Sequence, residues 1–393
     1  MREGWREVAV EDVARVVGGG TPRSNVPEFW GGQVQWLTPK DLSDRPARYT
    51  SVGSRTITEA GLKSSGAQVL PAGAVLLTSR APVGYVSVAS GPIATNQGFK
   101  SLILDDSQLP EFWYYLLMHS TDYLKAHSGG STFQEMSGGV LKKLRFLIPP
   151  LPEQRRIVDL VATLDDVVAA ASLAPARRAY DSILAAMASQ PGGLQLSDAL
   201  RPGGVARVVE PDEEYRILGV LRSGEGFIER GQIRGRGTGY RKLFRVGADE
   251  LVYRKLTAWE GPISVSTEAE SGGWVSPEFP IFKIDEAVLL PGLMRHFCRW
   301  PGFWRKIEDR LVGSVQRRKR LNPDALLGIE LPMPSLETQA SWLDALDSMW
   351  ESVGARSATV SALQRTRAHL LAALMSGEHE IPESYDELIG VAS

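Results

Sequence analysis

The sequence contains one stretch that occurs twice, and this repeat constrains the fold more than any other feature. The first copy runs from Leu147 to Ser189 and the second from Leu331 to Ser376. Each copy opens on a proline-punctuated segment, LIPPLPEQ or LPMPSLETQ, and closes on a similar heptapeptide, ILAAMAS or LLAALMS. The copies start 184 positions apart, so each closes one half of the 393-residue chain. A period this long indicates a duplicated module, because solenoid repeats are only about 20–50 residues long.

Each copy predicts a long helix with one apolar seam. In the second copy, apolar residues recur at alternating steps of three and four over roughly five heptads, which is typical of a coiled coil. We predict that the two helices pair as a spacer; the alternative is that each packs as an ordinary amphipathic helix on its own domain. Pro175 lies inside the first helix, lacks an amide donor, and predicts a kink or short break. The predicted seam residues are Ile157, Leu160, Leu164, Val168, Ile183, Leu184, Met187, Trp342, Leu346, Met349, Val353, Val360, Leu363, Leu370 and Leu374.

The remaining segments predict an α+β fold whose short strands, helices and turns recur in the same order in each half. The segment Leu251–Ile263 corresponds to Val75–Tyr85, and Val275–Phe282 corresponds to Ala94–Leu102. We therefore predict two tandem mixed α/β domains separated by two long antiparallel helices that form a coiled-coil spacer, with pseudo-two-fold symmetry. The predicted boundaries are 1–147 and 191–330 for the α/β domains, 148–190 and 331–377 for the helices, and 378–393 for a loose acidic tail.

Composition excludes several classes of protein. The apolar runs are shorter than the ~20 residues that a membrane-spanning helix needs, and the first residues lack the apolar core of a signal peptide. The single cysteine, Cys298, excludes an internal disulfide and a cysteine-based zinc site. The five histidines are scattered, so no metal site is expected. These features predict a soluble cytoplasmic protein without a membrane segment.

The sequence also lacks the common catalytic motifs. It has no glycine-rich phosphate loop followed by Lys-Ser/Thr, no His-Glu-x-x-His zinc motif and no hydrolase nucleophile elbow. The segment Ile148–Leu151 lacks the polar and aromatic ends of the amino-methyltransferase tetrapeptide. We therefore expect no catalytic residue and no bound cofactor. A site assembled in space from distant residues stays possible as an alternative.

Basic residues gather in two segments although the formal net charge is only −2. The segment from Arg222 to Lys255 contains nine Arg or Lys and four Asp or Glu. The segment from Arg305 to Arg320 contains seven Arg or Lys and two Asp or Glu. Arg or Lys can recognise guanine and Gln or Asn adenine, whereas Gly/Ser loops and basic clusters suit phosphates. The alternative for the basic cluster is a solvated face. The candidate DNA-binding residues are Lys40, Thr78, Ser79, Arg80, Asn96, Gln97, Ser131, Gln134, Arg254, Lys255, Gln316, Arg317, Arg318, Lys319 and Arg320.

Two variable α/β domains, each followed by a proline-rich entry and a long helix, resemble the specificity (S) subunit of type I restriction-modification systems. The resemblance covers nearly the whole chain, and Leu147–Ile157, Leu251–Pro262 and Val275–Phe282 carry it best. It implies that each domain reads one half of a split site on double-stranded DNA, and that the helices set the gap between the halves. It also implies two methylation (M) subunits, which hold S-adenosylmethionine, and ATP-dependent restriction (R) motor-nuclease subunits as partners. The alternatives are an assembly adaptor that does not bind DNA, and a nuclease or methyltransferase with an unrecognised site.

Overall fold

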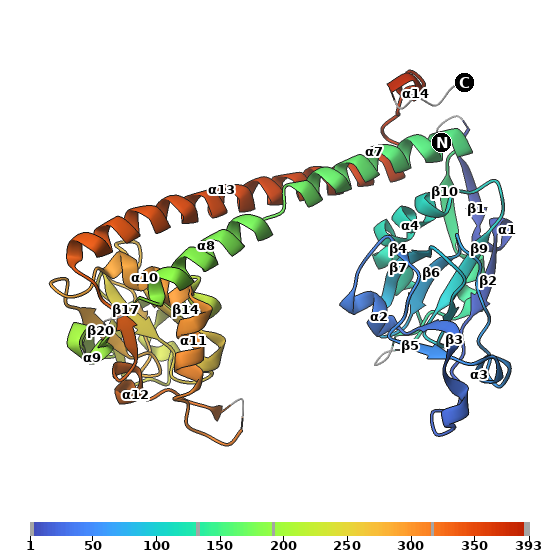
Figure 1. The fold of residues 1–393 in the computed structure, drawn as a ribbon. Helices are drawn as coiled ribbons and strands as arrows, with labels where there is room; N and C mark the ends of the chain where they lie inside the picture. Colours follow the sequence, from blue (N-terminus) through green and yellow to red (C-terminus); the bar gives the residue numbers. More distant parts are fainter. Residues whose placement is uncertain (1–3, 131–133, 191–192, 316–317, 389–393) are drawn as a thin grey trace. The chain divides into compact units, whose positions relative to one another are not determined.

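The protein forms two compact units in a computed structural model, which describes residues 4–130, 134–190, 193–315 and 318–388 (Figure 1). Unit 1 takes in residues 1–171 and 360–393, and unit 2 takes in residues 172–359. This division differs from the predicted boundaries, because unit 1 includes the start of the first repeated helix and the end of the second. Both units mix strands and helices, which confirms the predicted mixed α/β class.

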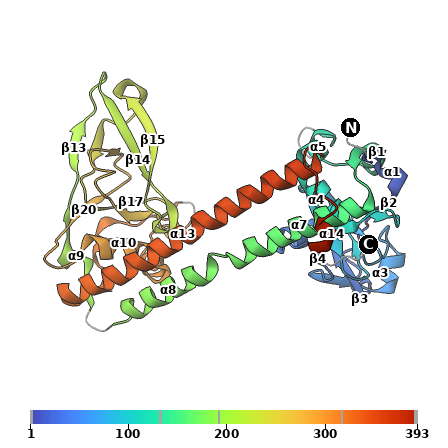
Figure 2. The same cartoon turned by 90° about the horizontal axis from the view of Figure 1, so that it is seen from above.

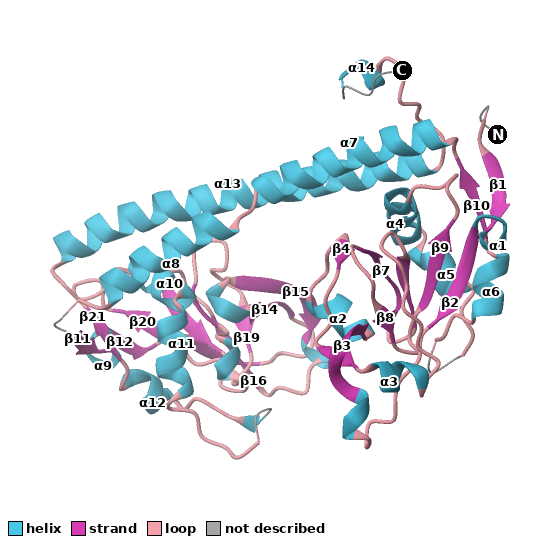
Figure 3. Ribbon diagram, turned by 45° about the vertical axis from the view of Figure 1, so that its right-hand side comes forward, coloured by secondary structure: helices cyan, strands magenta, loops and turns pink. Residues whose placement is uncertain are grey.

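Unit 1 contains a terminal strand pair, two sheets and several short helices (Figure 3). Its strands are β1 (Arg6–Ala9), β2 (Ala14–Gly18), β3 (Trp30–Leu37), β4 (Tyr49–Thr50), β5 (Arg55–Ile57), β6 (Val75–Ser79), β7 (Val83–Ala89), β8 (Ala94–Thr95), β9 (Lys100–Leu104) and β10 (Arg145–Ile148). Its shorter helices are α1 (Val10–Val13), α2 (Pro39–Asp44), α3 (Glu59–Lys63), α4 (Pro110–His119), α5 (Thr121–Ala126) and α6 (Gly138–Lys143). β1 pairs antiparallel with β10, and the two sheets have the strand orders β2-β9-β6-β7-β4 and β5-β3-β8.

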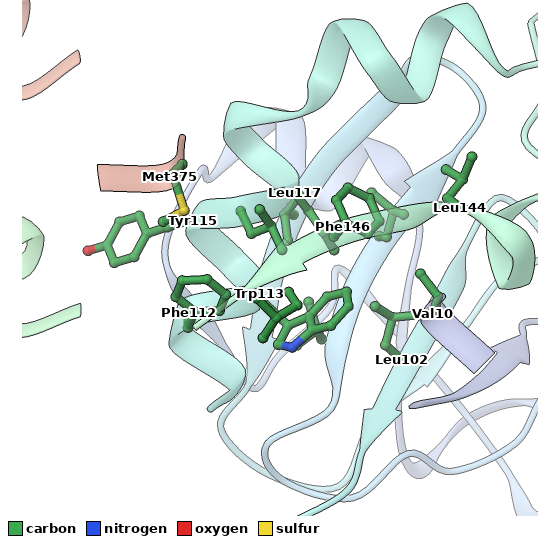
Figure 4. Packing of buried hydrophobic residues seen from close by; sticks show 14 of the residues in the cluster. Val10, Leu102, Phe112, Trp113, Tyr115, Leu117, Leu144, Phe146 and Met375 are labelled. Carbon is green, nitrogen blue, oxygen red and sulfur yellow. The ribbon is translucent and has the colours of Figure 1, made fainter. Parts of the chain in front are cut away.

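The core of unit 1 forms around α4. Trp113 of this helix is fully buried and meets Phe146 of β10 edge to face, with ring centroids 5.8 Å apart (Figure 4). Such a pair contributes ~0.5–1.5 kcal/mol beyond the burial of its area. Tyr115, also fully buried, lies beside Met375 from the end of the second repeated helix. The far end of the chain therefore completes the core that the N-terminal half begins.

Unit 2 repeats this plan with two strands added to one sheet and one strand fewer in the other. Its strands are β11 (Gly193–Gln195), β12 (Leu200–Pro202), β13 (Val205–Val208), β14 (Glu214–Val220), β15 (Phe227–Arg234), β16 (Lys242–Arg245), β17 (Glu250–Tyr253), β18 (Ile263–Val265), β19 (Trp274–Val275), β20 (Ile281–Ile284) and β21 (Glu330–Pro332). Its shorter helices are α9 (Leu196–Ala199), α10 (Pro291–Arg299), α11 (Pro301–Glu308) and α12 (Pro323–Leu327). The sheet β12-β20-β17-β18 has the strand order of β2-β9-β6-β7. In the sheet β13-β16-β19-β14-β15, the strands β15, β14 and β19 correspond to β5, β3 and β8 of unit 1. The strands β16 and β13 are additional.

A buried glutamine makes the same hydrogen bonds in both units. Gln154 donates to the carbonyl of Pro149 at 3.0 Å and accepts from the amide of Leu109, the residue before α4, at 2.9 Å. Gln339 donates to the carbonyl of Pro334 at 2.9 Å and accepts from the amide of Leu290, the residue before α10, at 3.0 Å. An unpaired buried amide group would cost about 1–3 kcal/mol. The repeated glutamine therefore ties the start of each long helix to the start of a domain helix.

The repeated stretches form long helices, as predicted. They are α7 (Leu151–Ala170), α8 (Ala174–Ala188) and α13 (Leu336–Met375). The helix ends at Ala170 and restarts at Ala174, with Pro175 in the first turn of α8, so the predicted break is confirmed. The predicted seam residues are buried or half-buried with one exception, Ile183, whose predicted position was wrong because it is 38% exposed.

Polar side chains lie among the packed helices in each unit. In unit 1, Asp165 of α7 accepts from the Tyr115 hydroxyl at 2.7 Å and from the guanidinium of Arg367 of α13. In unit 2, His296 of α10 lies 2.8 Å from the Tyr180 hydroxyl through Nδ1 and 2.9 Å from the carboxylate of Asp347 through Nε2. Since a carboxylate only accepts, Nε2 carries the proton and Nδ1 accepts from Tyr180.

His296 should make unit 2 sensitive to acid. Burial lowers the pKa of His296 below its ordinary value of 6.5, so the unfolded chain binds a proton more readily than the folded chain. The stabilisation is therefore complete above about pH 6.5 and is lost as pH falls through the folded-state pKa. Calorimetry between pH 5 and 8 should show this loss in the full chain and a flatter profile for His296→Gln. The exposed His369→Gln serves as the control, and equal profiles for all three proteins would contradict the assignment.

The acidic C-terminal segment packs on α7, so the prediction of a loose tail was wrong for the described residues 378–388. The guanidinium of Arg156 donates to both carboxylate oxygens of Asp386, at 2.8 and 2.7 Å, and lowers the pKa of that carboxyl. The hydroxyl of Tyr385, in the short helix α14 (Tyr385–Leu388), donates to Asp159 at 2.7 Å. Ile381 is 5% exposed and joins the core of unit 1. The acidic composition of this segment suggested disorder. Composition does not reveal tertiary contacts, and the contacts that order this segment come from α7.

Deleting residues 378–393 should destabilise unit 1. Loss of the buried Ile381 side chain alone removes roughly 1.5–3 kcal/mol of stabilisation from apolar burial. Loss of the Arg156–Asp386 ion pair adds to this. For a unit of this size each kcal/mol shifts the transition by about 2–4 °C, so the transition should fall by about 3–12 °C. Calorimetry of the full chain measures the shift, and deletion of residues 389–393 alone is the control. A transition that stays in place after the longer deletion would show that the tail contributes nothing.

Candidate nucleic-acid interface

Three segments of unit 1 meet at the end of β6. The amide of Ser79 donates to the carbonyl of Gly98 at 2.7 Å, and the carbonyl of Ser79 accepts from the amide of Met136 at 2.8 Å. The turn after β6, the loop after β8 and the Gly/Ser loop are therefore held side by side. On this cluster the guanidinium of Arg80 lies 3.6 Å from the carboxylate of Glu135.

Gly98 also brings α2 to the cluster. A Cβ at Gly98 would lie only 2.9 Å from Cγ of Pro39, the first residue of α2, so the backbone at residue 98 packs against the proline ring because it carries no side chain. Lys40 follows Pro39 and is exposed. Four segments that are far apart in sequence thus contribute to one end of unit 1.

Unit 2 builds the same arrangement at the end of β17. The amide of Lys255 donates to the carbonyl of Glu278 at 3.0 Å, and its carbonyl accepts from the amide of Leu321 at 3.0 Å. Arg320 pairs with the carboxylate of Glu278 at 3.0 Å. Arg254 donates to the carbonyl of Leu256 and to the carboxylate of Glu260, each at 3.0 Å. The two clusters therefore share a backbone framework and differ in the side chains that they present.

The predicted residues divide by exposure. Thr78 and Ser79 are fully buried, and the Thr78 hydroxyl donates to the carbonyl of Pro82, so these two side chains do not reach a surface. Asn96 accepts from the amide of Gly98 and shapes its turn. Ser131, Gln316 and Arg317 lie outside the described residues. The predicted residues at least partly exposed in the two clusters are Lys40, Arg80, Gln97, Gln134, Arg254, Lys255, Arg318, Lys319 and Arg320.

Carboxylates that sequence did not point to face the basic residues. Glu135, Glu260 and Glu278 each pair with a predicted arginine and lower the positive charge of the clusters. The correspondence between Val275–Phe282 and Ala94–Leu102 aligns Glu278 with the candidate residue Gln97, although Glu278 itself was not predicted. That correspondence was the available signal for Glu278; the pairing itself depends on tertiary structure.

The described ranges hold neither a metal cluster nor a membrane-crossing helix. Within them, no group of three or more His, Cys, Asp and Glu side chains is placed to hold a metal ion. Among the helices of those same ranges, none combines the length and apolar character that crossing a membrane requires.

Comparison with known proteins points to one family. Residues 2–171 match the model of the type I restriction modification DNA specificity domain. The specificity subunit of the type I restriction enzyme MjaIX from Methanocaldococcus jannaschii is 42% identical over 166 residues, which is 42% of this chain and 38% of the relative. That of the HindI enzyme from Haemophilus influenzae is 30% identical over 149 residues, which is 37% of this chain and 32% of the relative. The matched part thus spans less than two fifths of either relative.

Solved structures extend the likeness in fold to nearly the whole chain. A type I restriction-modification S subunit from M. genitalium superimposes with a TM-score of 0.52 at 12% identity, covering 96% of this chain and 97% of that one. A chain from a study of complex assembly and conformational transition in the type I system gives 0.58 at 15% identity, covering 95% and 98%. At such identities the likeness concerns the fold alone. Residues 2–171 thus form a type I restriction-modification DNA specificity domain.

Proposed function

We propose that this chain is the DNA-specificity subunit of a type I restriction-modification complex and reads a bipartite target on double-stranded DNA. The observation that carries the proposal is the repeated loop framework, in which Ser79 and Lys255 make equivalent backbone hydrogen bonds in the two units. A duplicated framework with different side chains suits the reading of two different half-sites. Lys40, Arg80, Gln97 and Gln134 would contact one half-site. Arg254, Lys255, Arg318, Lys319 and Arg320 would contact the other.

The long helices would serve as the spacer between the half-sites. Ile157 of α7 shares a core with Leu371 and Leu374 of α13, while Tyr180 of α8 shares another with Leu346. In unit 1 an early residue of the first stretch meets late residues of α13, and in unit 2 a late residue of the first stretch meets an early residue of α13, which suits an antiparallel pair. We propose that the pair forms a coiled-coil spacer with pseudo-two-fold symmetry, and that it sets half-sites about one DNA turn, ~34 Å, apart.

The chain would act without a catalytic site of its own. Two methylation subunits, with S-adenosylmethionine, would dock on the repeated regions, and ATP-dependent restriction subunits would join them. A net charge of −2 is compatible with DNA binding if these partners supply further phosphate contacts.

Gel-shift titration with a random pool of duplexes, followed by sequencing of the bound fraction, tests the proposal. The full chain is assayed with and without the methylation subunit, and the methylation subunit alone is the control. A two-part sequence preference that requires this chain supports the proposal, whereas no preference under either condition rejects it in favour of an adaptor. Assays of the isolated chain for DNA cleavage and methylation test the enzymatic alternative, and turnover in either would favour it.

A further inference from the structure

Two antiparallel strands of unit 2, β14 and β15, form a ribbon at one edge of a five-stranded sheet, which projects from the rest of the unit together with β13 (Figure 2). β15 is an edge strand, since in the described sheet it pairs with β14 alone. One face of the ribbon carries Tyr215, opposite Ile233, and packs on the core. Alternation along β15 therefore turns Gln232 and Arg234 to the opposite, solvent face. The register shift between Arg216 and Leu218 interrupts this alternation, so that Arg230 lies exposed on the face of Gly219.

The solvent face of the ribbon is basic and rich in hydrogen-bond donors. Arg216 lies opposite Gln232, and its guanidinium donates to the carbonyls of Ala269 at 3.0 Å and Ser271 at 2.9 Å, which fixes its position. Arg234 meets Glu214 at 3.4 Å, but these side chains are 71% and 55% exposed, and such exposed pairs contribute little.

Arg230 has no ion pair among the residues that the structure describes. It lies across the ribbon over Gly219, because a Cβ at residue 219 would come within 2.6 Å of its Nε atom. The glycine thus leaves room for the guanidinium to lie across the neighbouring strand. The ribbon therefore presents an arginine without an ion pair beside its register shift, and an exposed glutamine and a weakly paired arginine at alternate positions of the solvent face.

The base of the ribbon joins the loop cluster already described. The turn between β14 and β15 contains Arg222, whose Nε lies 3.2 Å from Oε2 of Glu260, and the same oxygen accepts from Arg254 at 3.0 Å. The amide of Gly224 in this turn donates to the carbonyl of Gly261 at 3.0 Å. The basic surface of unit 2 is therefore continuous from the loop cluster onto the ribbon.

We propose that the β14–β15 ribbon enters the major groove of duplex DNA and that Arg230, Gln232 and Arg234 read base edges there. The inference rests on the proposed function and deepens it by naming the reading element of unit 2. The major groove is about 12 Å wide and admits a two-stranded ribbon, whose strands lie ~4.8 Å apart. Arginine pairs with guanine and glutamine with adenine through two hydrogen bonds each. The ribbon offers both kinds of side chain, with Gln232 and Arg234 at alternate positions of one strand face and Arg230 beside the register shift.

Unit 1 contains a counterpart of this ribbon. β3 pairs antiparallel with β5 and parallel with β8, as β14 pairs antiparallel with β15 and parallel with β19. Gln33 and Gln35 lie at alternate positions of β3, and Gln33 is exposed. The ribbon is thus part of the repeated framework, while its side chains differ between the units.

Selection from a random duplex pool tests the inference, using the full chain assembled with the methylation subunit. One variant carries Arg230→Ala, Gln232→Ala and Arg234→Ala. A second carries Arg230→Lys and Arg234→Lys, which keeps the charge but loses the two-pronged donor. The control, Arg201→Ala with Lys283→Ala, removes two charges from paired positions of β12 and β20. Lys283 lies opposite Glu250, at the end of β17 away from the loop cluster.

Both ribbon variants should lose base preference in one half-site, by about tenfold or more at the affected positions, and keep it in the other half-site. The control should keep both preferences. If the lysine variant keeps its base preference and the alanine variant binds all sequences equally weakly, the ribbon does not read bases. It would then contact phosphates only. Preferences unchanged in both variants, or a loss of assembly with the methylation subunit instead, would also overturn base reading. If the unaltered chain shows no sequence preference, the proposed function itself fails. That result is distinguishable from the outcomes above, because each of them requires a preference in the unaltered chain.

Discussion

Replacing Arg318, Lys319 and Arg320 by alanine should weaken DNA binding about ten- to a hundredfold at ~0.1 M salt, and almost equally for all sequences. These residues lie beside the loop that follows β17, where Thr257 donates its amide to the carbonyl of Lys319. Arg318 is exposed and has no ion pair within the described residues, whereas Arg320 is already held by Glu278. For every phosphate that the protein no longer neutralises, the slope of log K against log salt should flatten by about one unit.

Titrations between about 50 and 200 mM salt measure this slope. The pair Arg201→Ala and Lys283→Ala provides a matched loss of charge at the far end of β17, and the effects are compared per charge removed. We expect that control to change the slope by much less. A loss of affinity confined to one base position would assign these residues to base reading instead, and a slope equal to that of the control would remove them from the interface.

The features that were predictable from sequence are those that local pattern specifies. Heptad spacing predicted α13 over its whole length, and Pro175 predicted the break between α7 and α8, because both effects act along one helix. The repeat also aligns Gln154 with Gln339, whose hydrogen bonds are equivalent. Ile183 failed because adjacent residues of a helix do not share a face, and its neighbour Leu184 is the one that is fully buried.

Tertiary contacts account for what sequence did not predict. Thr78 and Ser79 look like surface polar residues at a strand end, yet neighbouring strands and loops bury them completely. Glu135 and Glu278 come from loops distant in sequence, and no local rule pairs them with Arg80 and Arg320. The tail was misjudged for the same reason, since Arg156 lies 230 residues before its partner Asp386.

For the β14–β15 ribbon, composition predicted one part of the result and only the structure showed the other. The count of basic residues between Arg222 and Lys255 singled out the segment that contains Arg230, but it left out Arg216 and gave no reason to treat the two arginines differently. Strand register and the close approach at Gly219 distinguish them, because one guanidinium is held by backbone carbonyls and the other is unpaired within the described residues. Composition therefore located the basic surface, and geometry selected the residues on it.

Inserting one heptad into each long helix should move the two halves of the recognised site apart. Seven residues add about 10.5 Å to a helix, which corresponds to roughly three base pairs of DNA. The insertion sites are the break between Ala170 and Ala174 and the position after Thr359, near which the two units divide. A seven-residue insertion keeps the apolar seam in phase, whereas other lengths would rotate it.

The test compares the original target, found by selection from random duplexes, with targets whose gap is lengthened by about one to five base pairs. The double insertion should bind the original target roughly a hundredfold or more weakly and recover on a target lengthened by about three base pairs. A heptad in α13 alone, which leaves the paired helices unequal in length, is the control and should recover on no target. If the double insertion keeps its preference for the original gap, the helices do not set the spacing, and the proposed spacer is wrong even though each unit still binds DNA.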